Sequence, residues 1–257
     1  MSACPKKATS GVVSLIAVVS SVLMVPEWNV RAQSPAAQTQ KPRWNVSANG
    51  RVRFAKAYVV DQRLSALRRE PNLRSTVLQR LRVARAVYVL QSRIADQTRF
   101  YRVAVTRRTR GWIHESAIAV PGRLGQDQRV LELITIADDP IDRLTLCKLF
   151  IDRFKYSTLV PRALLLMGEE ADRAATSLIG RASRRLARGS GRLQGRMRDL
   201  YLSDSGLDRY SKLNVFFAFD ETSRMYEYDG WAYREILRRY PRSEEAEKAW
   251  TAVGGRR

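Results

Sequence analysis

Apolar and polar residues follow two different periods along this chain. Between residues 51 and 120 they tend to alternate, which is the period of a half-buried β-strand. Beyond residue 126 the apolar positions recur every three or four residues, which is the period of an amphipathic helix. The pattern therefore predicts an α+β multidomain protein, with a β domain at 51–120 and a helical domain at 126–254.

The clearest strand signal is the run 100–105. It is followed by a basic turn at 106–110 and by Gly111, which we expect to let the backbone turn before Trp112 and Ile113 re-enter the core. Further strands are expected at 51–60, 65–71, 77–81 and 83–90, and the set predicts a small barrel between Tyr58 and Ala119. In the run 100–105 one side carries Tyr101, Val103 and Val105, and the other carries Phe100, Arg102 and Ala104.

The helical half has recognisable helix starts. A helix is expected over 127–137, and Asp139 followed by Pro140 is a good N-cap with proline at the first helical position. Pro161 starts another helix. The stripes expected to face the core are Leu144, Cys147, Ile151 and Phe154 in one helix, and Leu164, Met167, Ala171, Ala174 and Leu178 in the other.

The C-terminal part predicts a helical hairpin. Pro241 ends the first helix, and Ser243 is expected to cap the second, with acidic residues in its first turn. The inner face of the first helix is predicted to hold Tyr233, Ile236, Leu237 and Tyr240, and that of the second Ala246, Ala249, Trp250 and Val253.

Two segments allow more than one interpretation. The run 181–198 has seven arginines and no acidic residue, and it is either the solvated end of a helix with a loop or an anion-binding patch. The segment 203–229 is rich in aromatic residues, which either fill the helical core or form a binding surface.

The N-terminus has the features of a secretory signal peptide. Lys6 and Lys7 precede the apolar run 11–25, and a small-residue cleavage site falls at 30–32. The run is shorter than the roughly 20 residues that span a bilayer. The sequence thus predicts a signal peptide at 1–32, a flexible linker at 33–50, and an exported chain, periplasmic or secreted, without a transmembrane segment. Whether the leader is cleaved or retained stays open.

The positive charge is concentrated in the β domain. The whole chain carries 46 Lys and Arg against 25 Asp and Glu, a net charge of +21. Residues 41–125 hold 19 basic and 4 acidic residues, and residues 126–257 hold 24 and 20. A field of this size attracts anionic partners. Outside the cytoplasm these are phospholipid head groups, wall polymers, lipopolysaccharide phosphates or an acidic protein, and nucleic acid is not expected. Solvated arginines without any ligand are the alternative.

The β half resembles a bacterial SH3-like (SH3b) domain. The resemblance rests on the opening 65–71, the strand 77–81, and the closing pair Phe100-Tyr101-Arg102-Val103 and Gly111-Trp112-Ile113. Ala66 stands where the family usually has Asn, and Glu70 where it usually has Gly. The resemblance implies a small SH3-like β-barrel, and these departures leave the family's ligand groove uncertain.

The helical half resembles a tetratricopeptide-like (TPR-like) hairpin. The match is Tyr233 to Ser243, with Ala246 and Ala249 beyond, and a weaker copy runs from Phe150 to Ser157. Tyr240 and Phe154 are 86 residues apart, which is not a multiple of a repeat of about 34 residues. The resemblance implies either two hairpins with an insertion or an irregular helical domain, and a surface that holds a protein partner.

Catalytic chemistry is not evident in the sequence. His114 is the single histidine, expected at the end of a strand, and Cys147 is expected to be a buried small hydrophobe. Gly-rich phosphate-binding patterns are missing, and Asp138-Asp139 is best explained by capping. We therefore expect no enzyme activity, no cofactor and no metal site. A pair of carboxylates that meet in space is the route to activity that stays open.

The sequence thus predicts an exported binding or scaffold protein. Its β domain would dock on peptidoglycan, a peptide or another anionic envelope component, and its helical domain on a protein partner. The alternative is a purely structural interaction module of an envelope complex, with no ligand in the barrel. The expected contact residues are Arg68, Tyr88, Tyr101, Arg107, Arg108, Arg110 and Trp112.

Overall fold

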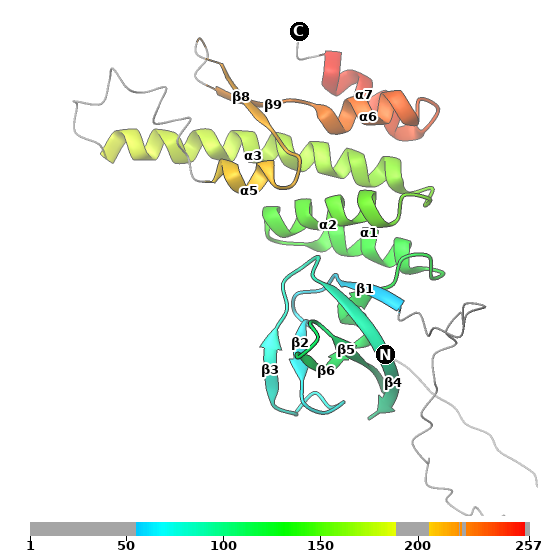
Figure 1. Cartoon of the computed structure of the whole chain (residues 1–257). Coiled ribbons are helices and arrows are strands. Elements are labelled where there is room, and N and C mark those ends of the chain that lie inside the picture. Colours follow the sequence, from blue (N-terminus) through cyan, green and yellow to red (C-terminus); the bar gives the residue numbers. More distant parts are fainter. Residues whose placement is uncertain (1–54, 189–205, 221, 223–224, 255–257) are drawn as a thin grey trace, which may run out of the picture. The chain divides into compact units, whose positions relative to one another are not determined.

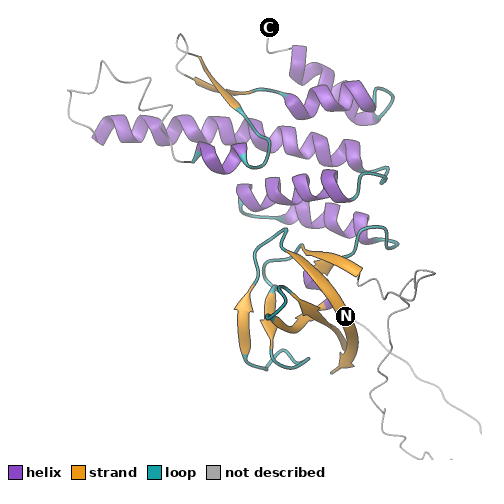
Figure 2. Ribbon diagram, in the orientation of Figure 1, coloured by secondary structure: helices purple, strands orange, loops and turns teal. Residues whose placement is uncertain are grey.

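The protein is an α+β structure in which an antiparallel sheet is followed by a helical region (Figures 1 and 2). The computed structural model describes residues 55–188, 206–220, 222 and 225–254, without the side chains of 181–188. The predicted order, β domain first and helices second, is confirmed. The expected signal peptide, the linker and most of the arginine run 181–198 lie outside the described residues.

The first sheet has seven strands in the order β3-β2-β6-β5-β4-β1-β7, and every pairing is antiparallel. Within the described residues β3 does not pair with β7, so the sheet is open, and the closed barrel expected between Tyr58 and Ala119 is not found. The strands are β1 Ala55–Val59, β2 Ala66–Arg68, β3 Val77–Arg80, β4 Ala86–Ala95, β5 Thr98–Ala104, β6 Arg110–His114 and β7 Ile118–Ala119.

One face of this sheet forms its own apolar core. Tyr101, Val103 and Val105 all lie in it, which confirms the predicted alternation of β5. Leu67 and Ile113 reach the same core from β2 and β6 and are fully buried. The opposite side chains of β5 differ among themselves, since Phe100 is buried beside His114 whereas Arg102 is exposed.

Gly111 has a different role from the one predicted. It does not turn the backbone but lies inside β6, and it is absent from the positions with positive φ. A Cβ at this position would stand 2.7 Å from Leu67 Cγ and 2.8 Å from the carbonyl oxygen of Arg68. Glycine is needed here because β2 approaches β6 too closely for any side chain.

The helical region begins with three helices that pack in sequence, α1 on α2 and α2 on α3. Their bounds are α1 Gln126–Ile136, α2 Pro140–Arg153 and α3 Val160–Arg188. Asp139 caps α2 as predicted, since its Oδ1 accepts a hydrogen bond from the N–H of Ile141 at 3.1 Å. The predicted stripes are confirmed as well: Leu144, Cys147, Phe154, Leu164, Met167, Ala171, Ala174 and Leu178 are buried, and Ile151 is half-buried.

The aromatic segment forms a short helix and a hairpin that the sequence did not reveal. Helix α5 spans Leu207–Ser211, and strands β8 Phe217–Asp220 and β9 Met225–Tyr228 pair as a separate two-stranded sheet. Strand β9 packs on α3. Tyr210, Tyr226 and Tyr228 are buried in the helical core, which favours the core interpretation of this segment, although Phe216 is 52% exposed.

The last two helices, α6 Trp231–Arg239 and α7 Glu244–Gly254, form the expected hairpin on α3. Two predictions about α7 are wrong. Trp250 does not join the inner face, being 64% exposed. The hydroxyl of Ser243 is buried without a hydrogen-bond partner in the described structure, so it does not form the expected side-chain cap. Ala246 and Ala249 are buried as predicted.

The sheet and the helices share one hydrophobic core. Tyr58, Val60 and Ala119 of the β half lie in the same cluster as the buried residues of α1 to α3. Arg129 of α1 adds polar contacts to the sheet, because its guanidinium donates to the carbonyl oxygens of Ser116 and Ile118. Among the described helices, none combines the length and the apolar composition that crossing a bilayer requires.

Candidate functional site

A row of side chains crosses five strands on the sheet face opposite the Leu67–Ile113 core. Residues directly opposite each other on paired antiparallel strands project to the same face. Arg68 lies opposite Trp112, and Trp112 lies opposite Arg102 on its other side. The row is continued by Val77 of β3 and Gln91 of β4. Neighbouring strands are about 4.8 Å apart, so Trp112 lies between two arginine residues on the sheet.

A second row runs parallel to the first on the same face. Arg110 lies opposite Ala104, Ala104 opposite Tyr88, and Tyr88 opposite Lys56. Arg110 and Lys56 are exposed, and Tyr88 is 46% exposed. Because Arg110 and Trp112 are two residues apart on β6, the two rows are adjacent. We call Lys56, Arg68, Tyr88, Arg102, Arg110 and Trp112 the cationic sheet face.

Four of the seven predicted contact residues, Arg68, Tyr88, Arg110 and Trp112, belong to this face. Arg107 and Arg108 are exposed in the turn between β5 and β6 that leads into it. Tyr101 does not belong to it. Its ring is 7% exposed in the core on the other side, and its hydroxyl accepts a hydrogen bond from Nη1 of Arg123 at 2.8 Å.

Sequence reasoning missed two members of the cationic sheet face, Lys56 and Arg102. The alternation of β5 already placed Arg102 on the side away from the core. What the sequence lacked was the register that sets Arg102 opposite Trp112 and Lys56 opposite Tyr88. Register joins residues that are distant in the sequence, and a shift by one residue would send each side chain to the other face.

Among the residues that the structure describes, the cations of this face have no acidic partner. In the described part of the sheet the ion pairs are Arg63 with Asp61, at 3.0 Å, and Arg99 with Glu115, at 3.9 Å. Neither pair involves the cationic sheet face. Arg68 is held differently, since its Nη1 donates to the carbonyl oxygen of Ser75 at 2.8 Å, a neutral acceptor that leaves the charge uncompensated. The face therefore combines aromatic surface with free positive charge, which suits an anionic ligand.

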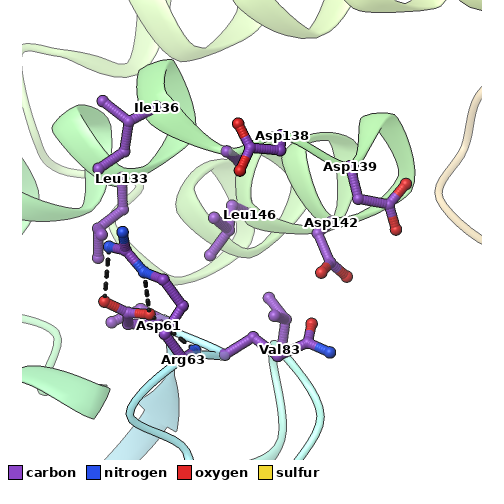
Figure 3. A pocket seen from close by; sticks show the side chains of 12 residues that line it. Asp61, Arg63, Val83, Leu133, Ile136, Asp138, Asp139, Asp142 and Leu146 are labelled. Carbon is purple, nitrogen blue, oxygen red and sulfur yellow. Dashed lines mark hydrogen bonds and ion pairs between the residues drawn. The ribbon is translucent and has the colours of Figure 1, made fainter.

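A pocket of about 340 Å³ lies where the sheet meets α1 and α2, and it is acidic (Figure 3). Asp61 enters from the sheet side and forms two side-chain hydrogen bonds with Arg63. Asp138, Asp139 and Asp142 come from the end of the α1–α2 connection and the start of α2. The apolar part of the wall consists of Val60, Val83, Leu133, Ile136, Ala137 and Leu146.

Two of the four carboxylates of this pocket have structural explanations. Asp61 is tied to Arg63, and Asp139 caps α2. Burial raises the pKa of Asp142, and the nearby charge of Asp139 raises it further. Within the described residues, no group of histidine, cysteine and acidic side chains is arranged to hold a metal ion. The function proposed below uses the cationic sheet face and not this pocket.

His114 and Cys147, the side chains best suited to catalysis by their chemistry, both have structural roles. Nδ1 of His114 accepts a hydrogen bond from the N–H of Ser116 at 3.1 Å, at the end of β6 as expected. Cys147 is fully buried in α2, and this burial raises the pKa of its thiol, which confirms the predicted small hydrophobe. The two residues belong to separate elements, the end of β6 and the middle of α2.

No protein-family profile, curated protein or solved structure matches this chain.

Proposed function

We propose that this chain is an exported, non-enzymatic binding protein of the cell envelope. In this proposal the sheet is an SH3-like (SH3b) module, and its cationic sheet face docks on an anionic envelope component, either peptidoglycan or a peptide. The helical region is TPR-like and holds a protein partner. The chain works outside the cytoplasm after export through its N-terminal signal, without nucleic acid as a partner.

One observation carries the docking proposal: Trp112 lies directly between Arg68 and Arg102, with Arg110 in the adjacent row. An indole flanked by guanidinium groups offers a flat apolar surface together with charge-assisted hydrogen bonds. Wall peptides and wall sugars present carboxylates beside apolar faces, so they match both properties. The absence of acidic side chains from the two rows leaves the positive charge available to such a ligand.

The test is sedimentation of the purified chain with isolated cell wall. The variant R102A/R110A removes two exposed arginines from the cationic sheet face, and we expect the bound fraction to fall severalfold, more strongly at low salt. The matched control is K212A/K248A, which removes the same charge from exposed positions of the helical region outside any proposed binding surface. Equal loss in both double variants would mean attraction by net charge alone, and no loss in R102A/R110A would disprove docking through this face.

A second candidate function is favoured by the shared core. Because Tyr58, Val60 and Ala119 pack with the helices, the sheet also serves as a structural base for the helical region. In a purely structural module, binding a protein partner would be the only function. Neither W112A nor R102A/R110A would then change wall binding. Full-length variants are required for this comparison, because separating the halves would expose the shared core. Incubation with labelled peptidoglycan, from which we expect no released product, tests the non-enzymatic part of the proposal.

A further inference from the structure

The two segments that resemble each other in sequence form equivalent turns. In each turn an aromatic residue ends a helix, Phe154 after α2 and Tyr240 after α6, and both have a similar backbone conformation. The N–H of Phe154 donates to Phe150 O at 2.8 Å, and that of Tyr240 to Ile236 O at 2.7 Å. Three residues later the N–H of each serine donates back to the aromatic residue, Ser157 at 2.8 Å and Ser243 at 3.0 Å.

These two turns lie beside each other in the folded protein and line one groove of about 540 Å³. The first turn contributes residues 155–158 together with Pro161 at the start of α3. The second contributes residues 239–243. Segments that are more than eighty residues apart thus form a single surface, which we call the turn groove.

The lining of the turn groove is aromatic and cationic. Tyr156 is 91% exposed, an unusual position for a large ring, and Lys155 Nζ stands 5.0 Å from the centre of that ring. On the other turn the guanidinium of Arg239 stands 5.4 Å from the centre of the Tyr240 ring. Pro161 and Pro241 add rigid apolar surface. None of the described residues that line the groove is acidic.

The positive charge of the groove is only partly compensated. Arg239 pairs with Glu235 at 3.3 Å. Lys155 and Arg242 are exposed and form no ion pair within the described structure. Helices α3 and α7 both begin at the groove, and a helix N-terminus carries partial positive charge. The first turn of α7 offsets part of this with Glu244 and Glu245, which do not line the groove.

The serine positions of the two turns differ in one respect. The hydroxyl of Ser157 donates to Asp127 Oδ2 at 2.7 Å, and its oxygen accepts from the N–H of Leu159. Ser243 also lines the groove, but its hydroxyl oxygen is buried and has no hydrogen-bond partner in the described residues. A buried hydroxyl without a partner costs free energy, so the second turn is less fully satisfied than the first.

We propose that the turn groove binds an extended acidic segment of a protein partner that contains proline. Grooves lined by aromatic rings and prolines accept extended, proline-containing peptides, whose conformation is already restricted. The unpaired cations Lys155 and Arg242 select carboxylates within that segment. An open groove of this kind would leave much of a small molecule in water, whereas a peptide strand can run along it. The inference specifies the protein partner in the function proposed above.

The test uses a fluorescent synthetic peptide of alternating glutamate and proline and the full chain, with binding followed by anisotropy. We expect K155A/R242A to weaken binding by about tenfold, and Y156A to weaken it severalfold. All three side chains are exposed, so these variants should fold normally. The matched control K212A/K248A removes the same charge from exposed positions outside the groove and should bind like the wild type.

Three outcomes would overturn the proposal. The first is equal binding by the wild type and by K155A/R242A. The second is competition by inorganic polyphosphate that matches an unlabelled copy of the peptide, since the groove would then bind anions of any kind. The third is a concentration-dependent rise in mass by light scattering that K155A/R242A abolishes, which would make a second copy of the chain the occupant. The variant R102A/R110A should bind the peptide normally, so failure of wall docking and failure of this proposal are distinguishable.

Discussion

Arg143 of α2 and Glu170 of α3 form a buried ion pair, with Arg143 Nη1 2.6 Å from Glu170 Oε2. The side chain of Glu170 is 3% exposed, and Arg173 approaches the same oxygen at 3.1 Å. Arg143 also donates to the carbonyl oxygen of Ala137 before α2. A single arginine therefore joins the α1–α2 connection, α2 and α3 through one buried carboxylate.

Removing one partner of this pair should strongly destabilise the fold. R143A would leave the carboxylate of Glu170 buried with only the half-exposed Arg173 as partner, and a loss of about 3 kcal/mol in the free energy of unfolding is expected. Urea unfolding followed by circular dichroism measures this. The double variant R143M/E170L keeps apolar volume without charge and should recover much of the loss. If R143A unfolds at the same urea concentration as the wild type, the pair does not hold the helices together.

Gly168 in α3 marks a close approach between two helices. A Cβ at this position would lie 2.6 Å from the ring of Tyr233 in α6, whose hydroxyl is fixed by a hydrogen bond to Asp172 at 2.8 Å. Tyr233 is also buried, so a shift of its ring would disturb other contacts. We expect G168A to lower the free energy of unfolding by about 1–3 kcal/mol through overpacking.

Gly254 in α7 provides the matched control for this substitution. Nothing lies within 4 Å of a Cβ at that position. Alanine is favoured over glycine in a helix interior by about 1 kcal/mol. Gly254 is the last residue of α7, so the gain there is smaller, and G254A should be neutral or slightly stabilising. Thermal unfolding of both variants decides the question, and destabilisation of both to the same degree would contradict the packing argument.

Asp127 should make the free energy of unfolding depend on pH. The hydrogen bond from the Ser157 hydroxyl lowers the pKa of Asp127 below its ordinary value in the folded protein. A lowered pKa stabilises the fold above the ordinary aspartate pKa of about 3.9, and the effect is lost as the pH falls through the lowered pKa. D127N should therefore cost roughly 1 kcal/mol at pH 7, because the site is partly screened by solvent.

The measurement is urea unfolding of D127N and wild type over a series of pH values from neutral to strongly acidic. The difference between the two proteins should shrink at acidic pH, where the wild-type carboxyl becomes protonated. S157A is the complementary variant, since it removes the donor and should reduce the pH dependence in the same way. A difference that stays constant from pH 7 to the acidic limit would show that the Asp127–Ser157 hydrogen bond does not stabilise the charged form.

Cys147 should be chemically inert in the folded chain. It is fully buried, and the raised pKa of its thiol disfavours the reactive thiolate. In a C4S variant, which leaves Cys147 as the only thiol, a colorimetric thiol reagent should detect no reaction before denaturation and one equivalent after it. Rapid reaction in the native state would contradict the burial of this residue.

The local sequence was sufficient to predict features that depend on a few neighbouring residues. Alternation along residues 100–105 predicted the inward side chains of β5, and Asp139-Pro140 predicted the start of α2. Both depend on backbone periods and on a cap that is formed within two or three residues. The same kind of reasoning predicted the inner stripe of α3.

The surfaces depended on contacts between distant residues, and only the tertiary structure decided them. Register set Arg68 and Arg102 on either side of Trp112, and the packing of α6 and α7 on α3 brought the turn after Phe154 next to the turn after Tyr240. Trp250 fitted the apolar pattern of α7 yet remained exposed. A helical period places residues on one face of a helix, but the neighbouring elements determine how much of that face is covered.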